Sequence, residues 1–108
     1  MQFAVRLTDG ATGDLQDLSD YIAGARGVGE ARQVLDRTKQ VLSSLGESPN
    51  RGTYPKELLD LGIREYREVF FKPYRIVYRV TEDDVRVLLI TDGRRDLRTL
   101  LQRRLLTP

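Results

Sequence analysis

The spacing of apolar residues divides the first half of the chain into a short strand and two helices. Apolar residues alternate with others over Phe3–Leu7, which predicts a strand. Mainly apolar residues then recur at steps of three and four, which is typical of amphipathic helices. The segment Gly27-Val28-Gly29 separates the two helical patterns and predicts a helical hairpin. The residues that carry the two patterns are Leu15, Leu18, Ile22 and Ala25, then Ala31, Val34, Leu35, Thr38, Val41, Leu42 and Leu45.

Local signals predict where these helices begin and end. Thr8 or Asp9 is expected to cap the first helix, because a short polar side chain accepts a hydrogen bond from the first turn. Gly46 is expected to end the second, since Ser48-Pro49 prevents continuation. Residues 46–62 then form a long connection, which we interpret as a crossover to the sheet with one helical turn over Lys56–Leu61.

The second half of the chain predicts three strands and a last helix. The strands are expected at Ile63–Phe71, Tyr74–Thr81 and Val85–Asp92, and the short turns between them predict antiparallel pairing. The last strand is apolar on both faces at Val87–Ile90, which predicts a central position in the sheet. A final helix follows, with Asp96 as its expected cap and Leu97, Leu100, Leu101 and Leu105 at helical spacing.

These elements predict an α+β fold in the order β-α-α-β-β-β-α. The helical hairpin is expected to pack on one face of a mainly antiparallel sheet, which gives a two-layer domain. With 108 residues, the chain is expected to form a single domain over residues 1–108, with one hydrophobic core.

Two missing residue types exclude several classes of function. The chain has no cysteine and no histidine. This excludes a disulfide scaffold, zinc sites with cysteine or histidine ligands, and histidine general-base catalysis. We therefore expect no metal and no cofactor. No apolar run approaches the length of a membrane span, and no signal peptide is recognisable, so we expect a soluble cytoplasmic protein without membrane contact.

The arginines are the main candidates for chemistry. Lys and Arg number 18 against 16 acids, and five arginines but one acid follow position 93, so the C-terminal end is a candidate contact surface. Arg75 and Arg79 lie four apart on one strand face, and with Arg64, Arg94 and Arg95 they could form a positive concavity for phosphate or acidic peptide. Alternatively, these residues form a solvated surface on which each arginine pairs with a local acid. The candidate acids are Glu65, Glu68, Asp92 and Asp96.

Several segments resemble the RelE/ParE superfamily of toxins. The resemblance covers nearly the whole chain and is most specific in the strand and in the Arg-Arg-Asp turn. It implies the same α+β fold and an antitoxin partner, which folds while wrapping the toxin in an oligomeric complex. The segments are Gly62-Ile63-Arg64-Glu65-Tyr66-Arg67-Glu68-Val69, Tyr74-Arg75-Ile76-Val77-Tyr78-Arg79-Val80, Val87-Leu88-Leu89-Ile90 and Gly93-Arg94-Arg95-Asp96-Leu97.

The superfamily contains two activities, and the resemblance is closer to the ParE branch. RelE-like members cleave mRNA on the ribosome and use cationic residues with a proton-transfer residue near the C-terminus. Arg75 and Arg95 match the arginines, but Leu101 stands where the tyrosine is expected. A ParE-like inhibitor of DNA gyrase is therefore expected. The alternative is a RelE-like endoribonuclease that uses Arg75, Arg79 and Arg95, with the ribosome, Tyr66 or Tyr78 transferring protons. A third reading is a non-toxic binding module.

We also predict a surface for each of the two partners. The target is expected to contact the last turn and helix, and the antitoxin is expected to cover apolar grooves and a strand edge, with salt bridges to arginines. The expected target-binding residues are Arg94, Arg95, Arg98, Arg103 and Arg104. The expected antitoxin-binding residues are Leu15, Leu18, Tyr21, Arg75 and Arg79.

Overall fold

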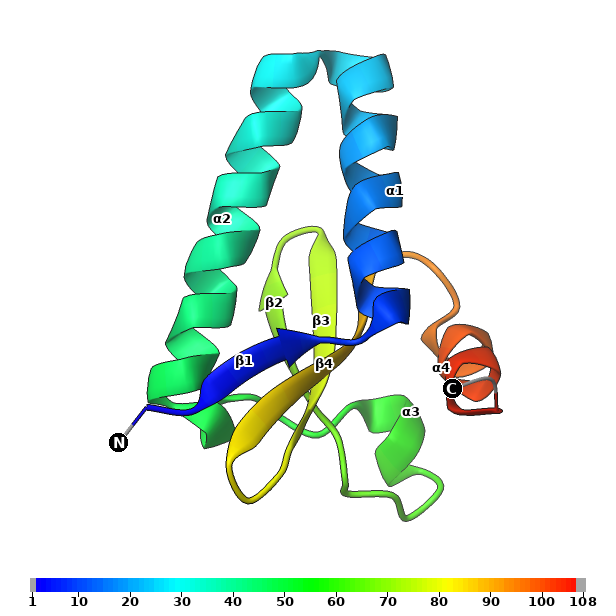
Figure 1. Ribbon diagram of the computed structural model, residues 1–108. Helices are drawn as coiled ribbons and strands as arrows, with labels where there is room; N and C mark the ends of the chain where they lie inside the picture. Colours follow the sequence, from blue (N-terminus) through cyan, green and yellow to red (C-terminus); the bar gives the residue numbers. More distant parts are fainter. Residues whose placement is uncertain (1, 107–108) are drawn as a thin grey trace.

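The computed structural model describes residues 2–106 and confirms the predicted α+β fold and element order (Figure 1). Within this range, the connection after the second helix adds a short 3-10 helix and a short α-helix, α3, where one helical turn was predicted. The elements are β1 Ala4–Leu7, α1 Asp9–Arg26, α2 Val28–Glu47, the 3-10 helix Pro49–Arg51, α3 Lys56–Leu59, β2 Arg67–Phe71, β3 Tyr74–Val80, β4 Asp84–Asp92 and α4 Leu97–Leu106.

The four strands form one mixed sheet in the order β1-β4-β3-β2. β4 is antiparallel to β3 and parallel to β1, and β3 is antiparallel to β2. The central position of β4 confirms the interpretation of its apolar run. The sheet is therefore mainly antiparallel, as predicted, and the parallel pairing of β1 with β4 is an addition that the sequence analysis did not make.

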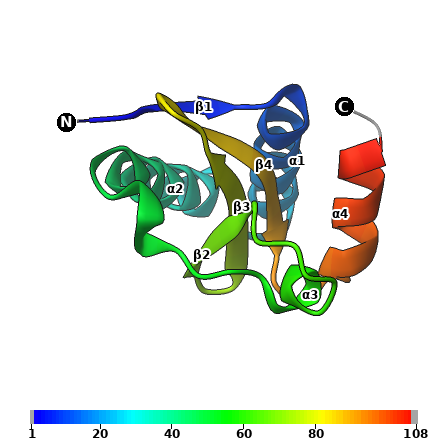
Figure 2. The ribbon, with the colours of Figure 1, turned by 90° about the horizontal axis from the view of Figure 1, so that it is seen from below.

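The α1–α2 hairpin covers one face of the sheet, which we call the hairpin face (Figure 1). Ile76 and Tyr78 of β3 are fully buried on this face. On the other face, which we call the outer face, Val77 of β3 packs against Leu58 of α3 and Leu101 of α4. Figure 2 shows α3 and α4 together at one side of the sheet, away from α2. The outer face is thus covered only in part.

A β-bulge in β4 changes which residues lie on each face. Val77 pairs with Leu89 but Tyr78 pairs with Val87, so Leu88 has no partner in β3. As a result Leu88 and Leu89 both pack on the outer face, while Ile90 returns to the hairpin face. Beyond the end of β1, side chains bind the open edge of β4: Asp14 accepts from the Ile90 N–H at 3.0 Å.

Two boundaries differ from the sequence-based expectations. Gly46 does not end the second helix; it lies inside α2, which runs to Glu47. A side chain there would meet the Phe3 carbonyl oxygen at 2.9 Å, so this glycine permits the close approach of the β1 entrance. The predicted strand over Ile63–Phe71 begins only at Arg67, because the preceding residues turn away and place Ile63 and Tyr66 against the α3–α4 cluster.

Tyr78 anchors the connection between α2 and the sheet. Its buried hydroxyl donates to the Pro49 carbonyl at 2.7 Å and accepts from the Gly52 N–H at 2.9 Å. A Cβ atom at Gly52 would lie 2.5 Å from this hydroxyl and 2.6 Å from the Glu68 carbonyl oxygen. The connection therefore requires glycine at this position.

Replacing Gly52 with alanine should lower the free energy of unfolding by about 1–3 kcal/mol, because the backbone must move to admit the methyl group. Urea unfolding followed by circular dichroism measures the change. Gly13→Ala is the matched control: open space surrounds a Cβ atom in that part of α1, and it should stabilise by about 0.5–1 kcal/mol. Equal effects of the two substitutions would contradict the packing at Gly52.

Candidate functional site

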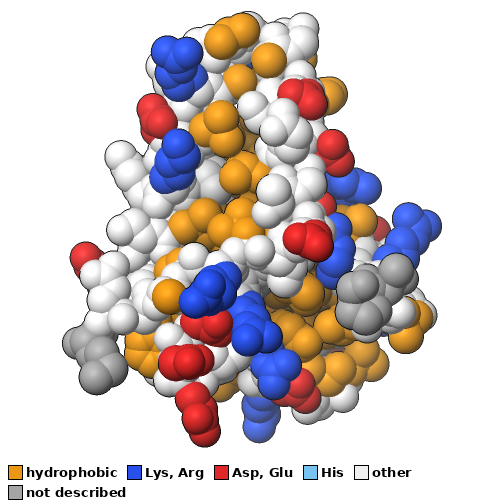
Figure 3. All heavy atoms as spheres, in the orientation of Figure 1, with side chains coloured by type: hydrophobic (Ala, Val, Ile, Leu, Met, Phe, Trp, Pro, Cys, Tyr) orange, Lys and Arg blue, Asp and Glu red, His pale blue; other side chains and the backbone are white. Residues whose placement is uncertain are grey.

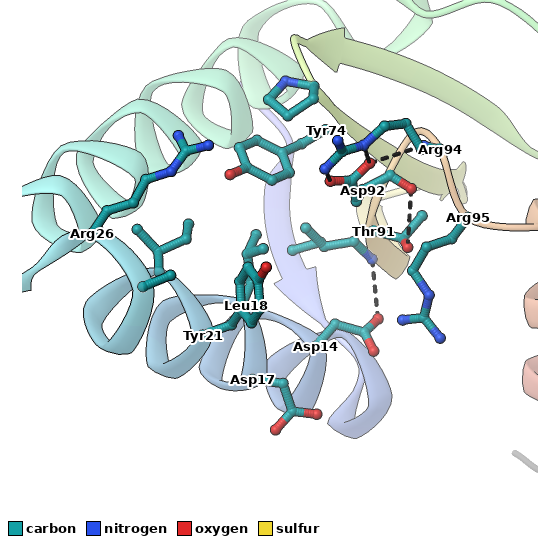
Figure 4. Close-up of a pocket in the computed structure, with 14 residues that line it drawn as sticks. Asp14, Asp17, Leu18, Tyr21, Arg26, Tyr74, Thr91, Asp92, Arg94 and Arg95 are labelled. Carbon is teal, nitrogen blue, oxygen red and sulfur yellow. Dashed lines mark hydrogen bonds and ion pairs between the residues drawn. The ribbon is translucent and has the colours of Figure 1, made fainter.

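A groove lies between α1 and the ends of β3 and β4 (Figure 4). Its volume is about 490 Å³. α1 forms one wall, and the strand ends with the turn after β4 form the other. The groove is lined by Asp14, Asp17, Leu18, Tyr21, Ile22, Ala25, Arg26, Pro73, Tyr74, Ile90, Thr91, Asp92, Arg94 and Arg95.

The helical wall exposes apolar surface. Leu18 and Tyr21 lie in the groove, and Tyr21 is 73% exposed. Figure 4 shows both side chains directed toward the space opposite Tyr74. An exposed tyrosine beside a hollow is typical of residues that anchor protein interfaces. Leu15, which was predicted with these two, instead packs against the main core and does not line the groove.

The opposite wall carries an ion pair at the end of β4. Arg94 donates from Nε and Nη2 to Asp92 at 3.0 and 2.7 Å, and its backbone N–H binds the same carboxylate at 2.9 Å. The bonds from Arg94 hold the pKa of Asp92 below its usual value. This local pairing was one alternative left open by the sequence. The Arg94 side chain remains 84% exposed, so it can still contact a partner.

The groove therefore has an apolar floor and a charged rim. Arg95 and Arg26 add positive charge at the rim, and Asp17 adds negative charge on the helical side. None of these three has an ion-pair partner within 4.0 Å among residues 2–106. Sequence analysis did not select Arg26, although it follows Ile22 by four residues on the same helix face. Such a groove suits an amphipathic protein segment.

Arg75 lies elsewhere, on the outer face, and is held by two carboxylates. Its Nε and Nη2 donate to Glu68 at 2.7 and 3.0 Å, and its Nη1 and Nη2 donate to Glu57 at 2.9 and 3.0 Å. The side chains of Arg75 and Glu68 are only 12% and 5% exposed. The hydrogen bonds from Arg75 hold the pKa of Glu57 below its usual value. Arg75 therefore fastens α3 to the sheet.

The arginines that were expected to form one concavity lie in separate places. Arg75 and Arg79 share a strand face, as predicted, but Arg79 is exposed and lies opposite Arg86 near the start of β4. Arg94 and Arg95 lie beyond the far end of the same strand, next to the groove. Since β4 rises about 3.3 Å per residue, roughly 20 Å separates Arg79 from Arg94 and Arg95. Arg75 lies opposite Thr91, near the same end of β4 as Arg94, but its guanidinium is held by Glu57 and Glu68 on the outer face. A single positive concavity is not formed.

The arginines of α4 differ in their surroundings. Arg103 is exposed, and Arg98 is exposed with its Nη2 3.9 Å from Asp60. Arg104 instead donates to both oxygens of Asp14 at 2.8 and 2.9 Å and to the Leu88 carbonyl at 2.8 Å. Arg104 thus fixes α4 to α1 and to the bulge in β4. Its guanidinium is occupied within the fold.

The two tyrosines that were considered for proton transfer both pack against hydrophobic clusters of the protein. Tyr78 is fully buried on the hairpin face, and burial raises the pKa of its phenol. Its hydroxyl already binds Pro49 and Gly52. Tyr66 packs against the α3–α4 cluster. Tyr78 is therefore buried and hydrogen-bonded within the fold, and its hydroxyl is not exposed to a substrate.

Comparisons with known proteins agree with this geometry. The family model described as the ParE toxin of the type II toxin–antitoxin system parDE matches residues 5–97. The chain belongs to the ParE toxin family. This ParE-family chain resembles a chain from the chromosomal ParDE toxin–antitoxin system of P. aeruginosa, with a TM-score of 0.72 and 17% identity over 84% of this chain and 96% of that one. It also resembles a chain of the RelBE2 toxin–antitoxin complex from Mycobacterium tuberculosis, with a TM-score of 0.57 and 21% identity over 85% and 92%.

These findings confirm the resemblance inferred from the sequence, closer to ParE. At such identities the two solved structures show that the ParE-family chain shares their fold. No sequence among curated proteins matches the chain. Among the described residues, no helix of this ParE-family protein is long and apolar enough to cross a membrane.

Proposed function

We propose that this ParE-family toxin inhibits DNA gyrase by binding it and stalling it with its DNA cleaved, and does not cut RNA itself. The observation that carries the proposal is the double ion pair of Arg75 with Glu57 and Glu68. The family match supports the assignment as a toxin of a type II toxin–antitoxin system. The choice of gyrase follows from the ParE branch of the family and from the arginines, since Arg75 is held by two carboxylates and is not free to bind a phosphate.

In the RelE-like alternative, cleavage of mRNA requires a cationic group that faces the scissile phosphate. Arg75, the arginine that matches the RelE-like position, gives four hydrogen bonds to two carboxylates. A phosphodiester that approached Arg75 would meet the negative charges of Glu57 and Glu68 first. The proton-transfer residue is missing as well, because Tyr78 is buried and Leu101 lies in the core. The site therefore favours a toxin that acts by binding.

The target surface in this proposal is the turn after β4 together with the exposed side of α4. Arg94, Arg95, Arg98 and Arg103 are exposed there. Guanidinium groups bind carboxylates and phosphates through paired N–H groups, so this surface suits a protein–DNA complex such as gyrase on its substrate. We leave Arg104 out of the surface because Asp14 and the Leu88 carbonyl occupy it.

The antitoxin in this proposal fills the groove beside α1 and adds to the free edge of β2. Apolar side chains of the antitoxin would pack against Leu18 and Tyr21, and Arg26 and Arg95 would lie at the rim of the groove. At the β2 edge, the backbone N–H and C=O of Glu68 already pair with Thr53, on the side away from β3. Phe70 is two residues further along β2, so its backbone N–H and C=O face the same free edge. Phe70 is also exposed, so an antitoxin strand can continue this pairing.

Induction of the chain without its antitoxin in a bacterial host tests the proposed activity. We expect growth arrest, loss of negative supercoiling in a reporter plasmid, and mRNA 5′ ends that match those of uninduced cells. Mapping of RNA ends and gel analysis of plasmid topology provide the two readouts. New mRNA ends at codon boundaries with unchanged plasmid topology would contradict the proposal and favour the ribonuclease. Normal growth with a folded protein would indicate a binding module without toxicity.

A further inference from the structure

Three arginines form a row across the uncovered part of the outer face. Arg6 of β1 lies opposite Arg86 of β4, and Arg86 lies opposite Arg79 of β3. All three alternate with buried residues of the hairpin face, so they share the outer face. Neighbouring strands are about 4.8 Å apart, so this arginine row spans roughly 10 Å.

One buried carboxylate orients two members of the row. Asp84 has a side chain only 8% exposed, and its oxygens lie 3.2 Å from Arg6 Nε and 3.3 Å from Arg86 Nε. The Thr81 hydroxyl also donates to it. Because both arginines use Nε, their terminal nitrogens have no hydrogen-bond partner among residues 2–106, and Arg79 has no ion pair there. The row presents oriented guanidinium forks to its surroundings.

The arrangement costs stability in the isolated protein. Like charges directly opposite each other on neighbouring strands repel, and the row contains two such pairs in succession. Asp84 pairs with Arg6 and Arg86, and Arg79 has no ion pair among residues 2–106. Packing does not require arginine here, since Arg6, Arg79 and Arg86 are all exposed or largely exposed. An anionic partner would relieve the repulsion.

The surroundings of the row indicate which kind of anion fits. Ile63, Tyr66, Leu88 and Leu100 are partly buried beside α3 and α4. Figure 3 shows basic side chains running down the front of the molecule over β1, β4 and β3, with hydrophobic side chains next to them. These side chains form a mainly aliphatic surface next to the row. Such a surface suits a protein segment better than nucleic acid, which binds aromatic and basic surfaces.

We propose that the arginine row binds an acidic, partly apolar segment of a protein partner. Carboxylates of the segment pair with the terminal nitrogens of Arg6, Arg79 and Arg86, and its apolar side chains cover Leu88 and its neighbours. This interface lies at the opposite end of β4 from the groove and from Arg94, so it does not depend on the proposed action on gyrase.

Titration of the full chain with a short peptide of alternating glutamate and leucine tests the interface. Binding is followed by NMR of the arginine Nε–H groups and by calorimetry at low salt. The variant is Arg79→Gln/Arg86→Gln, and the matched control is Arg32→Gln/Arg37→Gln, which removes the same charge from the exposed side of α2. We expect the first pair to raise the Kd of the peptide about tenfold and the second to leave it unchanged.

Two further measurements make the outcome decisive. Arg86→Thr should keep or raise the melting temperature, because it removes the central like charge from the row. An oligothymidylate serves as the nucleic-acid probe and should bind more weakly than the peptide. Equal peptide affinity in both double variants would overturn the proposal. Tighter binding of the oligothymidylate with shifts at Arg79 and Arg86 would overturn it in favour of nucleic acid.

Discussion

Replacing Arg75 with glutamine should lower the free energy of unfolding at neutral pH by about 3–5 kcal/mol, one of the largest effects of any single substitution in this protein. The reason is that Glu68 and Glu57 would remain charged and poorly solvated beside each other once their shared guanidinium is gone. Glutamine keeps much of the volume of the arginine side chain and one hydrogen-bond donor group. The loss of stability therefore reports mainly on the missing positive charge. Chemical unfolding followed by circular dichroism measures it.

The same variant should show a distinctive pH dependence. In the native protein the pKa of Glu57 is depressed, so the pair contributes stability that is present above the ordinary carboxyl pKa and is lost as the pH falls through the depressed value. In Arg75→Gln the Glu57 carboxyl loses the hydrogen bonds that depress its pKa, so it is expected to take up a proton more readily. The difference in stability between the two proteins should therefore shrink as the pH is lowered from neutral toward the ordinary carboxyl pKa.

Arg79→Gln is the matched control for Arg75, since it changes the same residue type on the same strand face. Arg79 is exposed and has no ion pair among the described residues, so its replacement should change stability by less than about 0.5 kcal/mol. If Arg75→Gln were as stable as the control at neutral pH, Arg75 would not be the structural clamp described here, and its guanidinium would be available for a substrate.

Removing Arg94 and Arg95 together should reduce the inhibition of gyrase about tenfold or more, without loss of fold. Both side chains are exposed beside the groove, and the Arg94–Asp92 pair is open to solvent. Exposed pairs contribute little to stability, so Arg94→Ala/Arg95→Ala should keep the melting temperature of the native protein. The concentration that halves supercoiling by purified gyrase measures the effect.

Arg32→Ala/Arg37→Ala serves as the control for this charge change, because both arginines are exposed on α2, away from the groove and α4. This variant should inhibit gyrase as strongly as the native protein. If Arg94→Ala/Arg95→Ala and the control both inhibited gyrase as strongly as the native protein, the target surface would lie elsewhere. A similar loss in both would show that net charge, and not the turn after β4, controls the encounter.

The order of elements could be predicted from the sequence because it depends on local periodicity. The caps at Thr8 and Asp96 were also readable: Thr8 accepts from the Ala11 N–H at 3.1 Å, and Asp96 binds Thr99 in the first turn of α4. Gly46 was misread because its role depends on a contact with Phe3, which is distant in the chain. The bulge at Leu88 depends on pairing between strands, which local periodicity does not report.

The candidate site was predicted only in part for a similar reason. The Arg94–Asp92 pair spans two residues, and Glu68 was already a candidate partner for the strand arginines. The remaining partners are far apart in sequence: Glu57 lies in the connection, and Asp14 reaches Arg104 from the first helix. These tertiary contacts decide which arginines are occupied and which remain exposed. The distinction between a nuclease and a binding toxin depends on that difference.

The most direct test of this account adds the purified, folded chain to purified gyrase, ATP and relaxed plasmid. We predict that supercoiling stops and that linear plasmid accumulates after protein denaturation, because in the proposed mechanism the toxin stalls the enzyme with its DNA cleaved. The same preparation should leave mRNA intact in a translating extract. Full supercoiling at toxin concentrations that cleave ribosome-bound mRNA would contradict the account.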